Sequence, residues 1–279
     1  EHPGAGGWGF LRGGMGTVST SIARSGEKHG LTIRTDAEVV SIDVANGRVT
    51  GVTTQDGGSI KAQVVASNAS CKVTFLKLVA EAALPAEFVR DIRNYRTFST
   101  AFKINIACER LPAYRAFDPE KCGFAYPSYT HIGPTIDYLE KAFVDAKAGW
   151  WSADPFITPV TPRLVDNTVA PPGKHVVHLF GGHAPYTLRN STWEKEKDRF
   201  AADMLRKVDE YAPGFSSGII GMQVLTPPDI ERIIGSPHGH IFHGELSAEQ
   251  LFFKRPAPHY ADYRSPIAGL YQCGSSAHP

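Results

Sequence analysis

The spacing of apolar residues follows a helical period near the start of the chain and then changes to the period of strands. Between Thr17 and Lys28, Val18, Ile22 and Ala23 share one helical face, and Gly30 is placed to end the helix in a left-handed conformation. From Thr32 to Ala66 the chain reads as short segments rich in Val, Ile and Thr. These segments are LTIRT, EVVSIDV, RVTGVTT, SIKA and QVVAS. The pattern predicts one helix followed by a small antiparallel sheet in meander order.

Two turn signals divide this sheet. Asn46-Gly47 is typical of a type I′ hairpin, because both central residues of that turn need a positive φ angle. Asp56-Gly57-Gly58 indicates a second turn of the same kind.

The middle of the chain alternates between helical and extended patterns. The segment from Cys71 to Tyr95 is helical with a break at Leu84-Pro85, and STAFKINIACE then predicts a strand with Phe102, Ile104 and Ile106 on one face. The following stretch GWWSADPFITPVTP contains three prolines and predicts irregular structure. KHVVHLFGG resumes the character of a strand.

The clearest helix runs from Thr192 to Tyr211, with an apolar stripe opposite a charged face. The stripe consists of Trp193, Phe200, Met204, Val208 and Tyr211. Ser191 and Glu194 have the spacing of a capping box, and Ser247-Ala248-Glu249-Gln250 repeats it before a short helix. Together these patterns predict an α+β protein, in which a mixed or antiparallel sheet with helices forms the largest part.

Composition excludes several classes of protein. The 279 residues are 42% hydrophobic and 10% aromatic, enough for a globular chain with one or two cores. With 29 basic and 28 acidic side chains, the chain has no excess positive charge to bind nucleic acid. No apolar stretch approaches the roughly 20 residues of a transmembrane helix. The four scattered cysteines suit a reducing compartment, so we expect a cytoplasmic protein; a peripheral membrane contact or a homo-oligomer stays open.

Two short motifs match known fingerprints in the wrong context. Gly4 to Gly9 forms a G-x-G-x-x-G pattern, but no hydrophobic strand precedes it and no helix follows at once, so a flexible loop is favoured over a dinucleotide loop. Gly214 to Gly218 matches the G-x-S-x-G elbow of hydrolases, yet a helix precedes it and a strand follows, the reverse of the elbow. We therefore interpret it as a helix-to-strand connection.

The histidines do not indicate a metal centre. His238, His240 and His243 lie close together, but only Glu245 is near to complete a ligand shell, so a loop lining a pocket or an interface is favoured. His175 and His178 lie three residues apart on a predicted strand and face opposite sides, so they cannot share an ion. We predict no metal site.

The order of motifs resembles that of phytoene desaturase-like flavoproteins, the carotenoid desaturases and isomerases among FAD-dependent oxidoreductases. The resemblance is carried by GGMG (Gly13 to Gly16), the helix after it, the EVVSI strand, the N-G hairpin, the D-G turn and VVASNA. Later, HIFHGELSAEQLFFKRP and GLYQCGSSAHP resemble C-terminal stretches of the same group. The likeness extends nearly from end to end and is least clear in the proline-rich middle.

The resemblance implies an internal fragment of a longer flavoprotein. Proteins of this group hold the FAD pyrophosphate with an N-terminal strand, glycine loop and helix that this sequence lacks, so the resemblance implies FAD in the full-length protein but not in this fragment. It implies pieces of a flavin-binding α/β domain at residues 1–69 and 246–279 around a substrate domain at 70–245. The resemblance implies that Gly14 and Met15 approach the isoalloxazine, that the backbone at Val39 meets the adenine, and that Gly274 lies near the ribityl or phosphate groups. It also assigns Gly13 to cofactor binding.

The implied activity is hydride transfer between an apolar small-molecule substrate and FAD, of the desaturase or isomerase type. Trp150, Trp151 and Phe156 would line an apolar pocket or fill an ordinary core. We identify no catalytic residue, because transfer of hydride from carbon to flavin depends more on positioning than on a proton shuttle. An amine oxidase-like enzyme and a non-enzymatic binding module are the alternatives, and the fragment alone is expected to be inactive.

Overall fold

A computed structural model describes residues 9–123 and 126–277 as two compact units. The first unit contains the residues up to Ile33 together with Ala101–Thr226, and the second contains Arg34–Thr100 and the residues from Pro227 onward. The chain therefore passes between the units three times. The sequence placed its boundaries at 69/70 and 245/246 instead; the roles predicted for those three segments are not tested by this division and stay predictions.

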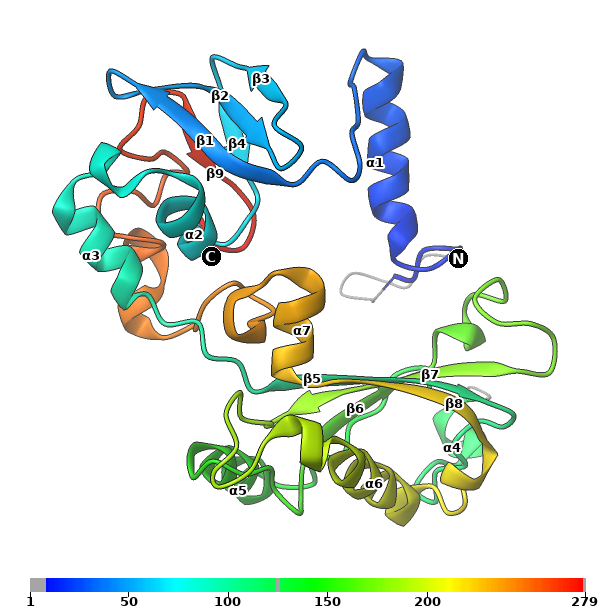
Figure 1. Ribbon diagram of the computed structural model, residues 1–279. Helices are drawn as coiled ribbons and strands as arrows, with labels where there is room; N and C mark the ends of the chain where they lie inside the picture. Colours follow the sequence, from blue (N-terminus) through cyan, green and yellow to red (C-terminus); the bar gives the residue numbers. More distant parts are fainter. Residues whose placement is uncertain (1–8, 124–125, 278–279) are drawn as a thin grey trace. The chain divides into compact units, whose positions relative to one another are not determined.

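The first unit is built on a four-stranded antiparallel sheet of order β6-β7-β5-β8, with α5 and α6 on one side of it (Figure 1). Its elements are α1 (Gly16–Lys28), β5 (Ala101–Cys108), α4 (Pro119–Cys122), α5 (Ile136–Lys147), β6 (Phe156–Val160), η3 (Pro162–Leu164), β7 (His175–Gly182), α6 (Trp193–Tyr211), η4 (Ser216–Gly218) and β8 (Ile219–Leu225). The strand β5 alternates as predicted, since Phe102, Ile104 and Ile106 are buried in the core.

The apolar stripe of α6 packs on that buried sheet face. Phe200, Met204 and Val208 are fully buried, and the ring of Phe200 meets the ring of Phe102 edge-on at 4.9 Å between centroids. Trp151 lies in the same core, stacked between Trp150 at 4.4 Å and Trp193 at 5.7 Å. Trp151 is therefore a core aromatic, the alternative that the sequence left open, and Trp150 is partly buried and packs against the same core.

The second unit combines a three-stranded antiparallel meander, β1-β2-β3, with a separate parallel pair, β4-β9. Its elements are β1 (Val39–Ala45), β2 (Arg48–Thr54), β3 (Ser59–Lys61), β4 (Val65–Ser67), α2 (Cys71–Val73), η1 (Thr74–Leu78), η2 (Glu81–Ala83), α3 (Ala86–Asn94), α7 (Pro227–Ile234), η5 (Pro237–Gly239), η6 (Ala248–Gln250), η7 (Phe252–Lys254) and β9 (Leu270–Gln272). Asn46 and Gly47 have φ angles of 50° and 72°, which confirms the predicted hairpin.

Three details of the prediction were wrong. LTIRT is not a strand. QVVAS does contain a strand, β4, but this strand pairs in parallel with β9 and is not part of the meander. The proline-rich stretch contains the strand β6, whose Pro159 is tolerated because β6 lies at the edge of its sheet. The antiparallel character of the two larger sheets and the α+β class are confirmed.

Neither predicted capping box forms. Thr192 is the N-cap of α6 and makes no side-chain cap bond, while Ser191 Oγ donates to Glu196 Oε1 at 2.8 Å. Ser247 precedes a single 3₁₀ turn and makes no side-chain cap bond either. The connection at residues 214–218 does run from a helix into a strand, as predicted.

No helix among the described residues is both long and apolar enough to cross a bilayer.

We expect the packing of α6 on the sheet to be the main source of stability in the first unit. Replacing Phe200 with Ala removes a fully buried ring and leaves a cavity, so the free energy of unfolding should fall by about 3–5 kcal/mol. Ile136 starts α5 and is 84% exposed, so Ile136→Ala should change the same quantity by less than about 0.5 kcal/mol. Denaturant unfolding followed by tryptophan fluorescence measures both; equal effects would contradict this packing.

Candidate functional site

The parallel pair in the second unit provides one candidate edge for a ligand. β4 and β9 pair in register from Val65 with Leu270 to Ser67 with Gln272, so both carboxyl ends meet at the same edge. In open α/β sheets, ligands bind beyond the carboxyl ends of the strands, where loops present main-chain groups. Here these loops are residues 68–70 and 273–276.

Gly274 brings the two loops into close approach. Its φ angle is +76°, and a Cβ atom at this position would lie 2.1 Å from Asn68 Oδ1. Any other residue would therefore be strained and would also displace Asn68. Gln272, 1% exposed, donates through Nε2 to the carbonyl oxygens of Ser67 (3.1 Å) and Ala69 (2.5 Å).

The other amide atom of Gln272 has no partner. Within residues 9–123 and 126–277, Oε1 of Gln272 is buried without a hydrogen bond. A buried acceptor left in this state costs free energy, which a buried water molecule or a bound polar group would recover. The carboxyl edge of β4 and β9 is therefore a candidate site for a polar ligand.

Arg255 stabilises the loop that follows β9 through hydrogen bonds to main-chain carbonyl groups. The residue is 1% exposed, and its guanidinium donates to the carbonyl oxygen of Ser275 through Nε (2.9 Å) and Nη2 (2.7 Å), and to that of Phe242 through Nη2 (2.6 Å). The Tyr95 ring lies 5.5 Å from the guanidinium carbon. A planar guanidinium can bond several carbonyls at fixed angles, so Arg255 fixes the segment next to Gly274.

The histidines of this region are hydrogen-bonded loop residues. His238 Nδ1 lies 2.6 Å from Thr97 Oγ1, and the His238 ring stacks on Phe98 at 4.3 Å. His243 Nδ1 lies 3.2 Å from Ser276 Oγ, and burial lowers the pKa of His240 to about 4. No group of three or more His, Cys, Asp or Glu side chains suited to a metal ion occurs in the described part of the chain.

The first unit contains the G-G-M-G loop, which precedes α1. Gly13 and Gly14 have φ angles of +91° and +84°, and Met15 is the N-cap of α1 and 67% exposed. The amides of Gly13 and Gly14 donate to the same oxygen, Oδ2 of Asp166, at 2.7 and 3.2 Å. Sequence reasoning missed Asp166, because a single aspartate in a loop carries no motif.

The five predicted cofactor residues thus fall in both units. Val39 is the first residue of β1, paired with Thr54, and belongs with Gly274 to the second unit, whereas Gly13, Gly14 and Met15 belong to the first. That they contact one flavin stays a prediction. The G-x-G-x-x-G pattern at Gly4 to Gly9 lies outside the described residues except for Gly9, as do the last two residues of the chain.

A row of polar side chains crosses the sheet face opposite the core of the first unit. Asn105 Nδ2 donates to Gln223 Oε1 at 3.0 Å, and His178 Nδ1 lies 2.9 Å from Asn105 Oδ1. Because that oxygen can only accept, His178 carries its proton on Nδ1 and leaves Nε2 as an acceptor. Burial and the nearby Lys103 lower the pKa of His178 to about 4. The sequence analysis had predicted only that this histidine shares no ion with His175.

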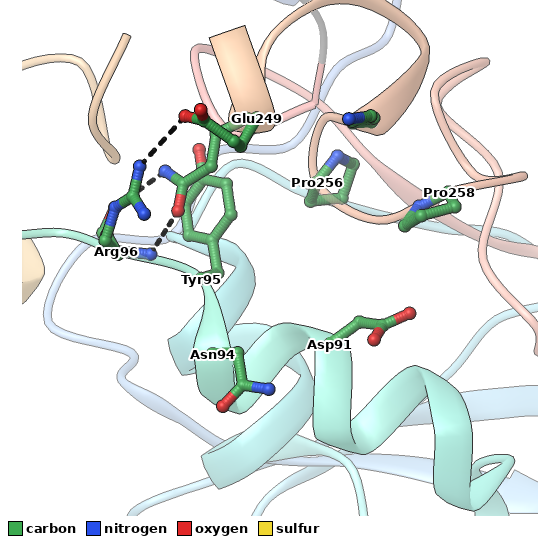
Figure 2. A pocket seen from close by; sticks show the side chains of 9 residues that line it. Asp91, Asn94, Tyr95, Arg96, Glu249, Pro256 and Pro258 are labelled. Atoms are coloured by element: carbon green, nitrogen blue, oxygen red, sulfur yellow. Dashed lines mark hydrogen bonds and ion pairs between the residues drawn. The ribbon is translucent and has the colours of Figure 1, made fainter. Parts of the chain in front are cut away.

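Two further cavities lie elsewhere in the units. One of about 240 Å³ in the second unit is lined by both charged and uncharged residues, and Figure 2 shows the side chain of Arg96 paired with that of Glu249. This ion pair measures 3.3 Å, and Arg96 also bonds Glu245 at 2.8 Å, so the charge of Arg96 is paired within the chain. The other, of about 370 Å³ in the first unit, is lined partly by Tyr114, Phe117 and Tyr211.

The hydrogen bonds of Arg255 predict a measurable contribution to the free energy of unfolding. Arg255→Met keeps the volume but leaves buried carbonyl oxygens without donors, so the free energy of unfolding should fall by about 3 kcal/mol. Arg264, whose side chain is 73% exposed and pairs with Asp262, is the matched control, and Arg264→Met should cost less than about 1 kcal/mol. A similar small loss of unfolding free energy for both variants, measured by denaturant unfolding, would contradict the stabilising role of Arg255.

Comparison with known proteins shows which family the chain belongs to. The model of the family "Flavin containing amine oxidoreductase" matches residues 3–191. The chain is 43% identical over 282 residues to pyridine nucleotide-disulfide oxidoreductase domain-containing protein 2 of Mus musculus, covering 98% of this chain and 48% of that protein. It is 24% identical over 275 residues to the phytoene desaturase (lycopene-forming) of a Paracoccus species, covering 98% of this chain and 52% of that enzyme.

Among solved structures, a variant of putrescine oxidase matches with a TM-score of 0.58 at 13% identity, covering 95% of this chain and 49% of that one. This likeness concerns the fold. The chain spans about half the length of the curated relatives it matches. The resemblance to carotenoid desaturases is thus supported by distant relatives, whereas the wider family is shown by the match over residues 3–191 and by the mouse relative. The chain belongs to the flavin containing amine oxidoreductase family.

Proposed function

We propose that the protein containing this chain is an FAD-dependent oxidoreductase that transfers hydride between an apolar substrate and the flavin. The observation that carries the proposal is the carboxyl edge of β4 and β9, where Gly274 permits close approach and Gln272 Oε1 is buried without a partner in the described part of the chain. Family membership supports the choice of a flavin for this edge.

In this proposal, Gln272 and Gly274 contact the cofactor, and the main chain at Val39 contacts its adenine end. The assignment of Gly14 and Met15 to the isoalloxazine, and of Gly13 to the cofactor, is carried over from the resemblance alone. When bound, FAD supplies the hydride acceptor. The residues of this chain orient the substrate and exclude water, as expected for a reaction in which positioning is the main contribution of the protein.

The apolar substrate follows from the resemblance to carotenoid desaturases and isomerases, which include a phytoene desaturase 24% identical to this chain. An amine substrate remains the alternative, since the family is named for amine oxidoreductases and the phytoene desaturase is a distant relative.

The test is flavin content in the full-length protein, measured from its absorption band after gel filtration. The wild type should be yellow, and Gly274→Ala should lose most of the flavin because the added Cβ collides with Asn68. Gly123 also has a positive φ angle, of 73°, but nothing lies within 4 Å of its would-be Cβ, so Gly123→Ala should keep the flavin. A colourless wild-type protein would overturn the proposal.

Substrate class is tested by reducing the bound flavin without oxygen. The proposal expects bleaching by a polyene and none by a primary amine. Bleaching by the amine alone would favour the alternative and would leave the flavin part of the proposal standing.

The neutral state of His178 predicts a pH dependence. Its folded pKa lies below the ordinary value of about 6.5, so the unfolded chain binds more protons between pH 6.5 and about 4, and stability should rise with pH across this window. His178→Gln should flatten that slope, and Lys103→Gln should move the pKa of His178 upward. Titration of the imidazole by NMR measures the pKa directly, and a midpoint near 6.5 in the wild type would be inconsistent with this environment.

A further inference from the structure

The glycine pair of the G-G-M-G loop forms a small anion-binding concavity. With φ angles of +91° and +84°, Gly13 and Gly14 turn their successive amide N–H groups toward one point, the arrangement that binds anions in many loops. Oδ2 of Asp166 occupies this point, 2.7 Å from the Gly13 nitrogen and 3.2 Å from the Gly14 nitrogen. Each amide also has a second acceptor, Thr168 Oγ1 at 3.1 Å for Gly13 and the Leu11 carbonyl oxygen at 3.0 Å for Gly14. The anion is therefore a side chain of the same unit, 153 residues later in the chain.

Asp166 is itself held rigidly. It is 5% exposed, it follows η3 at the end of the edge strand β6, and its amide donates to the carbonyl oxygen of Pro162 at 2.9 Å. Its second oxygen, Oδ1, accepts from Thr168 through the amide (2.9 Å) and the hydroxyl (2.6 Å). These bonds to a carboxylate are charge-assisted, and they lower the pKa of Asp166, with the Thr168 hydroxyl as the largest cause.

We propose that Asp166 is a positioning residue that fixes the G-G-M-G loop for the flavin by filling the Gly13–Gly14 concavity with its carboxylate. The part that concerns the flavin rests on the proposed function. Because a side chain of this chain already fills the concavity, the loop cannot bind a phosphate there. Its main chain is instead held in one conformation. Asp166 acts through the main chain of Gly13 and Gly14, and it connects the conformation of that loop to the sheet of the first unit.

The chemistry of the carboxylate makes the proposal specific. Both oxygens of Asp166 face donors only, since Gly13 and Gly14 contact Oδ2 and Thr168 contacts Oδ1 twice. An asparagine has the same shape but must turn an NH₂ group toward one of these two sets of donors. Asp166→Asn therefore removes the hydrogen bonds to one of the two sets of donors and hardly changes the volume of the side chain.

The first experiment is hydrogen exchange, by mass spectrometry, on this chain. Asp166→Asn should accelerate exchange of the Gly13 amide by about ten- to a hundredfold, the range expected for losing a hydrogen bond to a charged group. The Gly14 amide keeps its bond to the Leu11 carbonyl oxygen and should accelerate by a smaller factor. Asp118 caps the short helix α4 through the amide of Glu120 at 3.1 Å, so Asp118→Asn is the matched control and should leave the loop unchanged. Unchanged exchange in Asp166→Asn would overturn the proposal.

A milder variant covers the case in which Asp166→Asn does not fold. Thr168→Val keeps the carboxylate but removes the hydroxyl that orients it at 2.6 Å. The same hydroxyl oxygen also accepts directly from the Gly13 amide at 3.1 Å, so the Gly14 amide is the reporter here, and its exchange should accelerate by a smaller factor than in Asp166→Asn. If the Gly14 amide exchanged at the wild-type rate in this folded variant, the role assigned to the carboxylate would be wrong.

The second experiment separates a positioning role from a structural one. In the full-length protein, Asp166→Asn should shift the flavin absorption spectrum and its reduction potential while the melting temperature stays close to that of Asp118→Asn. Faster loop exchange with an unchanged spectrum and potential would show a structural role only and would overturn the proposal. A wild type without flavin would remove the proposed function, and the exchange result would still decide whether Asp166 fixes the loop.

Discussion

The parallel pairing of β4 with β9 is the constraint on which the candidate site depends. It joins Val65–Ser67 to Leu270–Gln272, so residues 68–269 lie between its two strands. Parallel strands need a crossover connection, and here that connection contains the entire sheet of the first unit as well as the helices of the second. The same pairing places Asn68 against Gly274 and buries Gln272. Without it, the loops that carry these residues would share no edge.

The polar groups around this edge explain how such a short pair is held. Two strands of three residues bury little apolar surface, and a pair of this size is marginal by itself. Gln272 bonds the carbonyls of the β4 loop, and Arg255 bonds the carbonyl of Ser275 in the β9 loop. The edge is therefore stabilised mainly by hydrogen bonds to main-chain groups, and a glycine at position 274 is what allows the loops to meet.

How much could be predicted from the sequence depended on how local each interaction is. The β1–β2 hairpin was predictable because positive φ angles at Asn46 and Gly47 are a property of those two residues. The strand β5 and the helix α6 were predictable because their apolar periods are clear. The capping boxes failed because Ser191 found a different partner, Glu196, which spacing alone does not reveal. Sequence analysis missed the β4–β9 pair, Arg255 and Asp166. Each of them contacts a segment that is not adjacent in the chain, and no short motif indicates such a contact. The cofactor residues came from the resemblance to flavoproteins, and their contacts with a flavin remain predictions.

Accessibility of Cys273 in the full-length protein is the most direct test of the claim that the β4–β9 edge holds the cofactor. This free thiol is partly exposed and directly precedes Gly274, whereas Cys122 is an exposed thiol of the first unit and serves as an internal reference. Alkylation rates of both would be compared by mass spectrometry in the flavin-free and FAD-loaded forms. The account predicts that FAD slows alkylation of Cys273 and leaves Cys122 unchanged. Equal rates at Cys273 in the two forms would contradict it.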